Sequence, residues 1–283
     1  MSFFGSPVAI CVAPNGARRT KVDHPPIPLT PLELAAEARL CRDAGASILH
    51  LHVRDEGGRH SLDAGRYRDA IAAIEEEVGG ELLLQITTEA VGMYSVAEQV
   101  DVVKSVVPAA ASVAFREIKS EGEDRAAAFF AWASEAEVAI QHILYSADEL
   151  TCFADFIGRH RLADPAQMLF VVGSYASSRG GKPQDLLDFL NVRPDNWEWG
   201  VCGFGAAEFA CAAAAIGLGG HVRVGFENNV MNAAGEAASS NSENVGVVAR
   251  LAQLAGRPIA DVETAAAIYG ANPRERARKE VAA

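Results

Sequence analysis

The stretch ILHLHVRDEGG, Ile48 to Gly58, carries two histidines inside an otherwise apolar run. Alternate side chains of a strand share a face, so His50 and His52 would lie about 7 Å apart on one side of a buried strand. Two imidazole rings at that spacing can bind one metal ion between them. The alternative is that both histidines line a core and hydrogen-bond to backbone or carboxylate groups. A third ligand nearby would favour the metal site.

The run HVRVGFENN offers that third ligand. As a strand it would place His221, Arg223 and Gly225 on one face, with Glu227 at its end. Two imidazoles and one carboxylate with an open position form the catalytic type of zinc site, although cobalt, manganese and iron accept the same ligands. A lone glutamate at a strand end is otherwise a solvated carboxylate. Arg223 needs an anionic ligand or a carboxylate partner, either Asp55 or Glu227.

Further polar residues lie in and after the predicted strand Leu82–Thr87. Gln85 and Thr87 share one face of this strand, and Thr88 and Glu89 follow it. Their side chains are candidates for hydrogen bonds to a substrate carboxylate. The alternative is a polar filling of the protein interior.

Two other segments could bind an anion. The turn CGFGAAEF contains Gly203 and Gly205 just before a predicted helix, where backbone N–H groups can bind phosphate or carboxylate. A tight turn without a ligand explains the same pattern equally well. Arg179 and Lys182, in the loop 173–183, could bind a phosphate-rich cofactor, although charged loop residues are more often only solvated.

These residues need elements that bring them together, and the chain alternates strands with helices. Apolar runs predict strands at Val8–Ala13, Ile48–Val53, Leu82–Thr87, Ala111–Phe115, Val138–Leu144, Met168–Gly173, Trp197–Cys202 and His221–Phe226. The first helix starts with the capping box Thr30 to Glu33, has Pro31 at its first position and ends at Gly45. The other helices are predicted at Asp63–Glu77, Val96–Val107, Glu123–Ala133, Ala147–Gly158, Gln184–Leu190, Ala206–Ile216 and, as the last, from Ser240 onward.

Eight strand–helix pairs in 283 residues predict a single α/β domain, a (β/α)8 TIM barrel over residues 1–283, with a charged tail from about residue 272. An open doubly wound sheet is the alternative, because a strand count does not establish closure. Closure would put the first strand between the second and the eighth. The two histidines and Glu227 would then belong to strands only about 10 Å apart.

Composition limits the class of function. The net charge is −12 and there is no long basic run, which argues against nucleic-acid and membrane-surface partners. Hydrophobic residues make up 49% of the chain, enough for a large core, yet no apolar run reaches the roughly 20 residues that span a bilayer. The five cysteines form no CxxC pair and their number is odd. They predict reduced thiols in a cytoplasmic protein.

Three motifs in this order resemble those of the β-keto acid cleavage enzymes: GASILHLHVRDEGGR, LLLQITTEAVGM and LGGHVRVGFENN. The segment PNGARRTKVDHPPIPLTPLELAAEARLCRDAGAS is also similar to the N-terminal pattern of that family. The resemblance extends from Val8 to about Pro258. It implies a zinc-binding (β/α)8 barrel, usually homo-oligomeric, with a tetramer favoured. It also implies that a β-keto acid and acetyl-CoA react to give acetoacetate and a new acyl-CoA.

The resemblance further implies roles for individual residues. The zinc ligands of the family correspond to His50, His52 and Glu227. Its catalytic arginine corresponds to Arg223, and its polar pair after the third strand corresponds to about Thr87 and Thr88.

The chain departs from the family pattern at positions that matter for catalysis. In a member whose substrate carries an amino group, a catalytic aspartate follows the glutamate ligand; here that position is Asn228, which cannot act as a base. Glu89 is therefore a candidate for the base. The same member has acidic residues where this chain has Arg18 and Ala139. We therefore expect a substrate with a neutral or anionic tail, bound in part by Arg18.

Other functions fit the same barrel and metal ligands. A metal-dependent aldolase or lyase would not need acetyl-CoA. A zinc-dependent hydrolase is a further alternative, although its HxH pair usually ends the first strand rather than the second. A non-enzymatic metabolite sensor would carry an effector or DNA-binding segment, and none is evident in the sequence.

Overall fold

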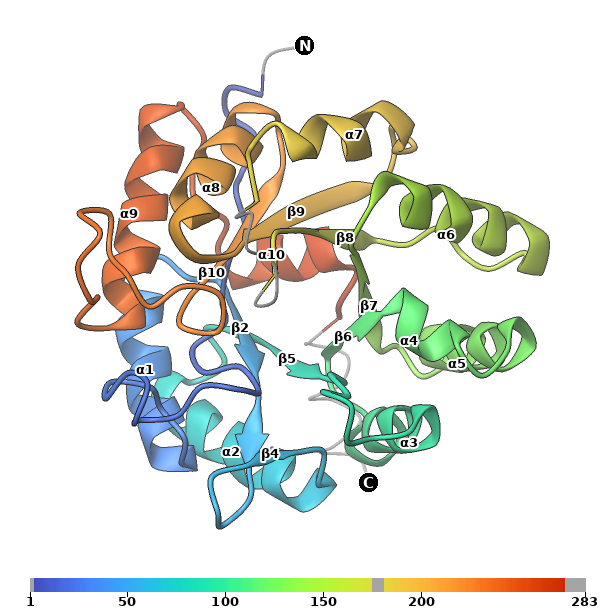
Figure 1. The fold of residues 1–283 in the computed structure, drawn as a ribbon, viewed down its shortest axis with the longest axis horizontal. Helices are drawn as coiled ribbons and strands as arrows, with labels where there is room; N and C mark the ends of the chain where they lie inside the picture. The colour runs from blue at the N-terminus through green and yellow to red at the C-terminus, as the bar shows by residue number, and fades with distance from the viewer. Residues whose placement is uncertain (1–2, 175–180, 273–283) are drawn as a thin grey trace.

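The computed structural model describes residues 3–174 and 181–272, and in this part of the chain eight parallel strands close into a barrel (Figure 1). Around the barrel the order is β1-β10-β9-β8-β7-β6-β5-β2. These strands are β1 (Ile10–Val12), β2 (Ile48–Leu51), β5 (Leu83–Thr87), β6 (Ala110–Ala114), β7 (Ala139–Leu144), β8 (Gln167–Val172), β9 (Glu198–Gly203) and β10 (His221–Val224). The predicted (β/α)8 barrel is confirmed, and the alternative of an open sheet is wrong.

Helices surround the barrel, as Figure 1 shows. The predicted ones are α1 (Pro31–Asp43), α2 (Ala64–Val78), α3 (Val96–Val106), α5 (Glu123–Glu135), α6 (Ala147–His160), α7 (Asp185–Val192), α8 (Glu208–Gly217) and α9 (Asn241–Leu254). Their ends follow the sequence signals. Thr30 and Glu33 form the capping box of α1, and Ser240 accepts the N–H of Glu243 at the start of α9. Gly45, just past α1, has a φ of 112°, which favours glycine.

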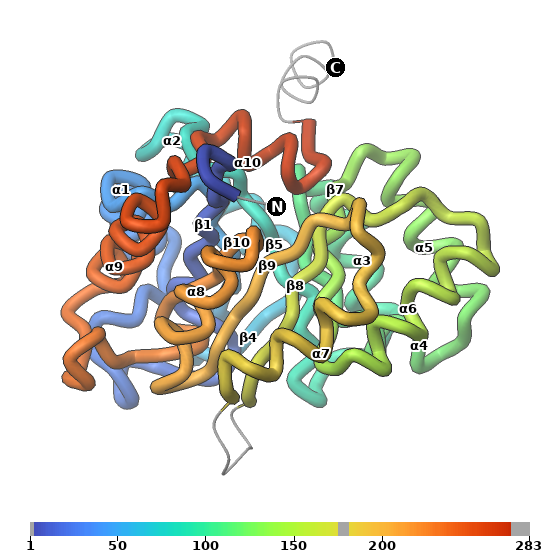
Figure 2. The backbone as a smooth tube through the Cα atoms, turned by 90° about the horizontal axis from the view of Figure 1, so that it is seen from above, coloured from blue at the N-terminus to red at the C-terminus, as the bar shows by residue number. Residues whose placement is uncertain are grey.

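The sequence did not predict several short elements. They are the antiparallel pair β3 (Val53–Arg54) and β4 (His60–Ser61), helix α4 (Phe115–Lys119), the 3₁₀ turn η1 (Gly205–Ala207) and helix α10 (Val262–Tyr269). The prediction that the helix from Ser240 is the last one is therefore wrong. Helix α10 is only two turns long and alanine-rich, so its apolar periodicity is weak. It lies across one end of the barrel, at the top of Figure 2.

The inside of the barrel differs between its two ends. At the end covered by α10, small and apolar strand residues such as Cys11, Ile48 and Leu83 pack with Ala265 and Tyr269 of that helix. Buried polar and charged side chains are concentrated toward the other end, where the parallel strands finish. In (β/α)8 barrels this end carries the functional residues.

The pairing of β1 explains how distant parts of the sequence meet. On one side Cys11 is opposite Arg223 of β10, and on the other side it is opposite Ile48 of β2. Strands β2 and β10 therefore both flank β1, as predicted for a closed barrel.

Other predictions concern the whole chain. All five cysteines lie in the described residues, and none of them forms a disulfide. No helix in the described part of the chain combines the length and apolarity needed to cross a bilayer. Arg179 and the charged tail beyond Asn272 lie outside the described residues.

Candidate active site

His50, His52 and Glu227 meet at the end of the barrel where the strands finish. His50 belongs to β2, His52 follows it directly, and Glu227 lies on the turn after β10. The Nε2 atoms of the two histidines are 3.0 Å apart. Glu227 Oε2 lies 3.4 Å from Nε2 of His50 and 3.1 Å from Nε2 of His52. All three side chains are buried, and their ligand atoms lie within 4.8 Å of one another.

The chemistry of this cluster fits a divalent metal. His50 Nδ1 lies 2.9 Å from Gln85 Oε1, an oxygen that can only accept, so Nδ1 carries the proton and Nε2 directs a lone pair into the cluster. Burial lowers the pKa of His50 to about 3, which keeps the ring neutral. A neutral imidazole, a second imidazole and a carboxylate with an open side are the donors of a catalytic zinc site. The residues present therefore fit Zn²⁺.

Arg223 is the charged neighbour of this cluster. Its Nη2 lies 3.0 Å from Glu227 Oε1 and 3.5 Å from the sulfur of Cys202. Burial by itself would raise the pKa of Glu227, but the cation of Arg223 and the imidazoles hold that pKa well below its ordinary value. Of the two partners that the sequence allowed for Arg223, the structure selects Glu227, since Asp55 pairs with Arg59 at 2.8 Å.

Glycines and one arginine shape the turn that carries Glu227. Gly225 has a φ of 134°, and a Cβ there would lie 2.5 Å from the carbonyl oxygen of Ala13. A Cβ on Gly16 would lie 2.5 Å from Cγ of Glu227. Arg19 Nη1 donates to the carbonyl oxygens of Phe226, at 2.7 Å, and Glu227, at 3.1 Å. The turn is therefore held by its backbone, and the side chain of Glu227 faces the histidines and Arg223.

Glu208, in the first turn of α8, also holds the segment that carries Glu227 in place. Its Oε1 accepts the N–H of Gly225 at 3.0 Å, and its Oε2 accepts from Asn229 Nδ2 at 3.0 Å. Asn229 is fixed in turn by hydrogen bonds to the backbone of Met231. Because Glu208 is almost fully buried, its two acceptors cannot be replaced by water without rearrangement.

Replacing Glu208 with alanine is expected to weaken Zn²⁺ binding by about 10–100-fold, because the buried donors of Gly225 and Asn229 lose their acceptor and the turn with Glu227 loses its position. Calorimetric titration with Zn²⁺ measures the change. Glu149→Ala is the matched control, since Glu149 is also a helix carboxylate that accepts a backbone N–H, from Tyr145 at 2.8 Å, but lies outside the cluster. Equal zinc affinity in the two folded variants would contradict the role of Glu208.

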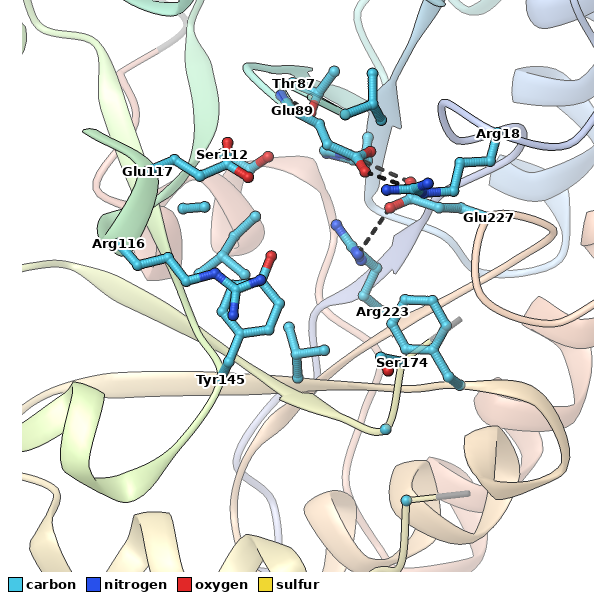
Figure 3. A pocket seen from close by; sticks show the side chains of 18 of the residues that line it. Arg18, Thr87, Glu89, Ser112, Arg116, Glu117, Tyr145, Ser174, Arg223 and Glu227 are labelled. Carbon is cyan, nitrogen blue, oxygen red and sulfur yellow. Dashed lines mark hydrogen bonds and ion pairs between the residues drawn. The ribbon is translucent and has the colours of Figure 1, made fainter. Parts of the chain in front are cut away.

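A cavity of about 890 Å³ opens beside the cluster. Figure 3 shows Arg18, Glu89, Arg223 and Glu227 on one side of it, facing Arg116 and Tyr145 on the other. Its volume is in the range of small-molecule sites.

Three predicted polar residues at the end of β5 and just after it line this cavity: Thr87, Thr88 and Glu89. The hydroxyl of Thr87 accepts the N–H of Glu89 at 3.1 Å, so its own proton is available to a ligand. The hydroxyl of Thr88 donates to the carbonyl oxygen of Ser112 at 3.1 Å. Glu89 Oε1 lies 4.0 Å from Nε of Arg18. Burial raises the pKa of Glu89 above its ordinary value of 4.5.

The structure does not bring every predicted residue to the cavity. Gly203 packs against α8, and the N–H of Gly205 donates to the carbonyl oxygen of Asn228 at 3.0 Å, so this segment is a tight turn. Asn228 is fully buried and is not among the residues that line the cavity. Ala139 lies at the start of β7 in the apolar layer near α10, so it cannot contact a substrate there. Lys182 does line the cavity.

Sequence analysis missed lining residues in β6 and in the segments that follow β6 and β7. Ser112 belongs to β6, Arg116 to α4, and Tyr145 follows β7. In a (β/α)8 barrel the residues just after each strand face the active site, and this rule would have indicated Arg116 and Tyr145.

Comparisons with known proteins cover nearly the whole chain. A family model described as beta-keto acid cleavage enzyme matches residues 7–270. The 3-keto-5-aminohexanoate cleavage enzyme of Fusobacterium nucleatum subsp. nucleatum is 33% identical over 262 residues, which cover 91% of this chain and 94% of that protein. The 3-oxoadipate:acetyl-CoA acetyltransferase of Cupriavidus necator is 27% identical over 277 residues, with coverages of 93% and 95%.

A likeness to solved structures concerns the fold alone. The apo structure of ObcA has a TM-score of 0.65 and 16% sequence identity, and the match covers 87% of this chain and 66% of that one.

The fold and the cluster together define a (β/α)8 barrel with a candidate catalytic metal site at the end of its strands. The family match covers nearly the whole of this barrel. The chain belongs to the β-keto acid cleavage enzyme family, as its motifs predicted.

Proposed function

We propose that the protein is a zinc-dependent enzyme that converts a β-keto acid and acetyl-CoA into acetoacetate and a new acyl-CoA. The observation that carries this proposal is the buried set His50, His52 and Glu227, with Arg223 beside it, at the edge of a cavity large enough for a keto acid. Membership of the family supports the reaction type, and the names of relatives support acetyl-CoA as co-substrate.

His50, His52 and Glu227 would hold the metal, and a bound Zn²⁺ would act as a Lewis acid toward the keto oxygen. Thr87 would donate its hydroxyl proton to the substrate carboxylate. Glu89 would take a proton from the acidic CH2 of the keto acid.

The remaining roles concern charge. Arg223 would stabilise the negative charge that moves onto the keto oxygen, because its cation is buried next to the cluster and keeps its charge. Asn228 cannot be a base, and its burial away from the cavity lining supports Glu89 for that role.

The assay for this proposal follows acetoacetate formation by the zinc-loaded protein. Product that requires a keto acid, acetyl-CoA and Zn²⁺ together supports it. Cleavage that proceeds equally well without acetyl-CoA would instead identify a metal-dependent lyase or hydrolase.

The assignment of Glu89 predicts a pH dependence. Because burial raises the pKa of Glu89, its carboxyl takes up a proton at a higher pH than a solvated glutamate would, and a protonated carboxyl cannot act as a base. We expect kcat/KM to fall as the pH drops through this raised pKa, that is, above pH 4.5. The pH–rate profile of Glu89→Gln should have low activity and lack this acid limb. An identical acid limb in the variant would contradict the assignment.

We further propose that the substrate does not carry an amino group. Arg18 lines the cavity, and its cation would repel an ammonium group in the substrate tail. Selective turnover of 3-keto-5-aminohexanoate over uncharged β-keto acids would contradict this proposal.

We also propose a cytoplasmic homo-oligomer, with a tetramer favoured by the likeness to the family. The five free thiols support a reducing compartment. Light scattering coupled to size-exclusion chromatography measures the oligomeric state, and a monomer at micromolar concentration would contradict it.

A further inference from the structure

Arg116 occupies a different side of the cavity from the candidate metal ligands. It lies in the first turn of α4, directly after β6, and its guanidinium is 3.5 Å from the centroid of the Tyr145 ring. In the barrel order, β6 and β7 lie across from β1, whose two neighbours carry the ligands. Figure 3 shows Arg116 and Tyr145 facing Arg223 and Glu227 across the open space.

Arg116 differs from the other arginines of the cavity in its partners. Arg223 and Arg18 each have a carboxylate oxygen within 4.0 Å. Among the described residues, no carboxylate forms an ion pair with Arg116 within this distance.

Other nearby carboxylates are already engaged with the backbone. Glu117 Oε2 accepts the N–H of Ala90 at 3.4 Å, and Asp185 Oδ2 accepts the N–H of Lys182 at 2.9 Å. Glu149 accepts the N–H of Tyr145 at 2.8 Å; burial raises the pKa of its carboxyl, and the nearby charge of Arg116 opposes that shift. None of these three carboxylates forms an ion pair with Arg116.

Stacking prepares this guanidinium for a planar anion. The ring of Tyr145 covers one face of the guanidinium, which restricts its orientation, while Arg116 as a whole is exposed and lines the cavity. Tyr145 is itself held by the hydrogen bond from its N–H to Glu149. An arginine fixed in this way binds carboxylate or phosphate oxygens through two parallel hydrogen bonds.

We infer that Arg116 binds an oxyanion of a substrate on the side of the cavity opposite the metal ligands. This inference rests on the proposed function, which supplies two sources of such a group. One is a second carboxylate at the far end of the β-keto acid, which would make the substrate a β-keto dicarboxylic acid. The other is a phosphate of acetyl-CoA.

The test compares the zinc-loaded wild type with Arg116→Met, which keeps an apolar stem against Tyr145 but loses the charge. The keto acids are β-keto dicarboxylic acids and β-keto monocarboxylic acids of equal chain length. The acetyl donor is either acetyl-CoA or acetyl-pantetheine, which lacks the phosphates of CoA. If Arg116 binds a carboxylate in the substrate tail, Arg116→Met should raise the KM for the dicarboxylic acid by about 10-fold or more and leave the KM for the monocarboxylic acid unchanged. If Arg116 instead binds a phosphate, Arg116→Met should raise the KM for acetyl-CoA by the same factor and leave the KM for acetyl-pantetheine unchanged.

Two further variants sharpen the result. Arg116→Lys, which keeps the charge without the planar fork, should recover only part of the affinity. Arg125→Met is the control for charge alone, because Arg125 pairs with Glu121 on the outside of α5. Unchanged KM values for every substrate in an active Arg116→Met would overturn the inference and leave the proposed function standing. If the wild-type protein forms no acyl-CoA from any of the keto acids, the proposed function is overturned, and this inference with it.

Discussion

Replacing His50 with alanine is expected to weaken Zn²⁺ binding by more than about 100-fold and to abolish acetoacetate formation. The imidazole Nε2 is directed into the cluster by the hydrogen bond between Nδ1 and Gln85. Loss of an outer partner of a metal ligand already costs about 10–100-fold in affinity, so loss of the ligand itself costs more. Metal content after dialysis, calorimetric titration with Zn²⁺ and the acetoacetate assay measure the effect.

His142→Ala is the matched control for this experiment. His142 is also a buried histidine whose pKa burial lowers to about 3, but it lies on β7 against the rings of Phe130 and Phe153. This variant should lose stability through packing and keep the metal content of the wild type. A His50→Ala protein that binds as much zinc as His142→Ala would show that the metal site lies elsewhere.

Replacing Arg223 with methionine is expected to lower kcat by about 100–1,000-fold while the protein still binds Zn²⁺. No metal ligand is removed, but the buried cation that would stabilise negative charge on the keto oxygen is lost. The metal-free variant should also be less stable by about 3–5 kcal/mol, since Glu227 keeps a buried charge without its partner. Bound Zn²⁺ should recover much of this loss, because it supplies a new positive charge beside Glu227.

Arg257→Met separates this effect from the loss of any buried arginine. Arg257 donates to the carbonyl oxygens of Ser6, Ile216 and Gly220 and lies away from the cluster. Its replacement should destabilise the protein equally with and without zinc and leave kcat of the folded enzyme unchanged. The two variants are compared by their thermal unfolding, measured once with a chelator and once with Zn²⁺, and by their kcat. A kcat in Arg223→Met equal to that in Arg257→Met would contradict the catalytic role of Arg223.

The barrel and the ligand cluster could be predicted from the sequence because both depend on local patterns. The barrel strands are rich in apolar residues, and most long helices carry a capping signal, as Thr30 and Ser240 illustrate. Closure of eight strands into a barrel is enough to bring His50 and Glu227 together, because only β1 lies between their strands.

Other features depend on tertiary packing that no short pattern encodes. Glu208 looks like a helix carboxylate in the sequence, and only its burial against Gly225 and Asn229 reveals its role. The pairing of Arg116 with Tyr145 joins two separate strand ends. At Gly205 the local pattern was misleading: the glycines suggested an anion site, but the N–H of Gly205 donates to the carbonyl oxygen of Asn228.

The central claim is that the keto acid is cleaved by exchange with acetyl-CoA. The most direct measurement incubates the zinc-loaded protein with a panel of β-keto acids and acetyl-CoA labelled with a heavy isotope in its acetyl group, followed by mass spectrometry of the products. The proposed reaction predicts a new, unlabelled acyl-CoA and acetoacetate that carries the label. Cleavage products without label and without a new acyl-CoA would contradict the claim and assign the site to a lyase or a hydrolase.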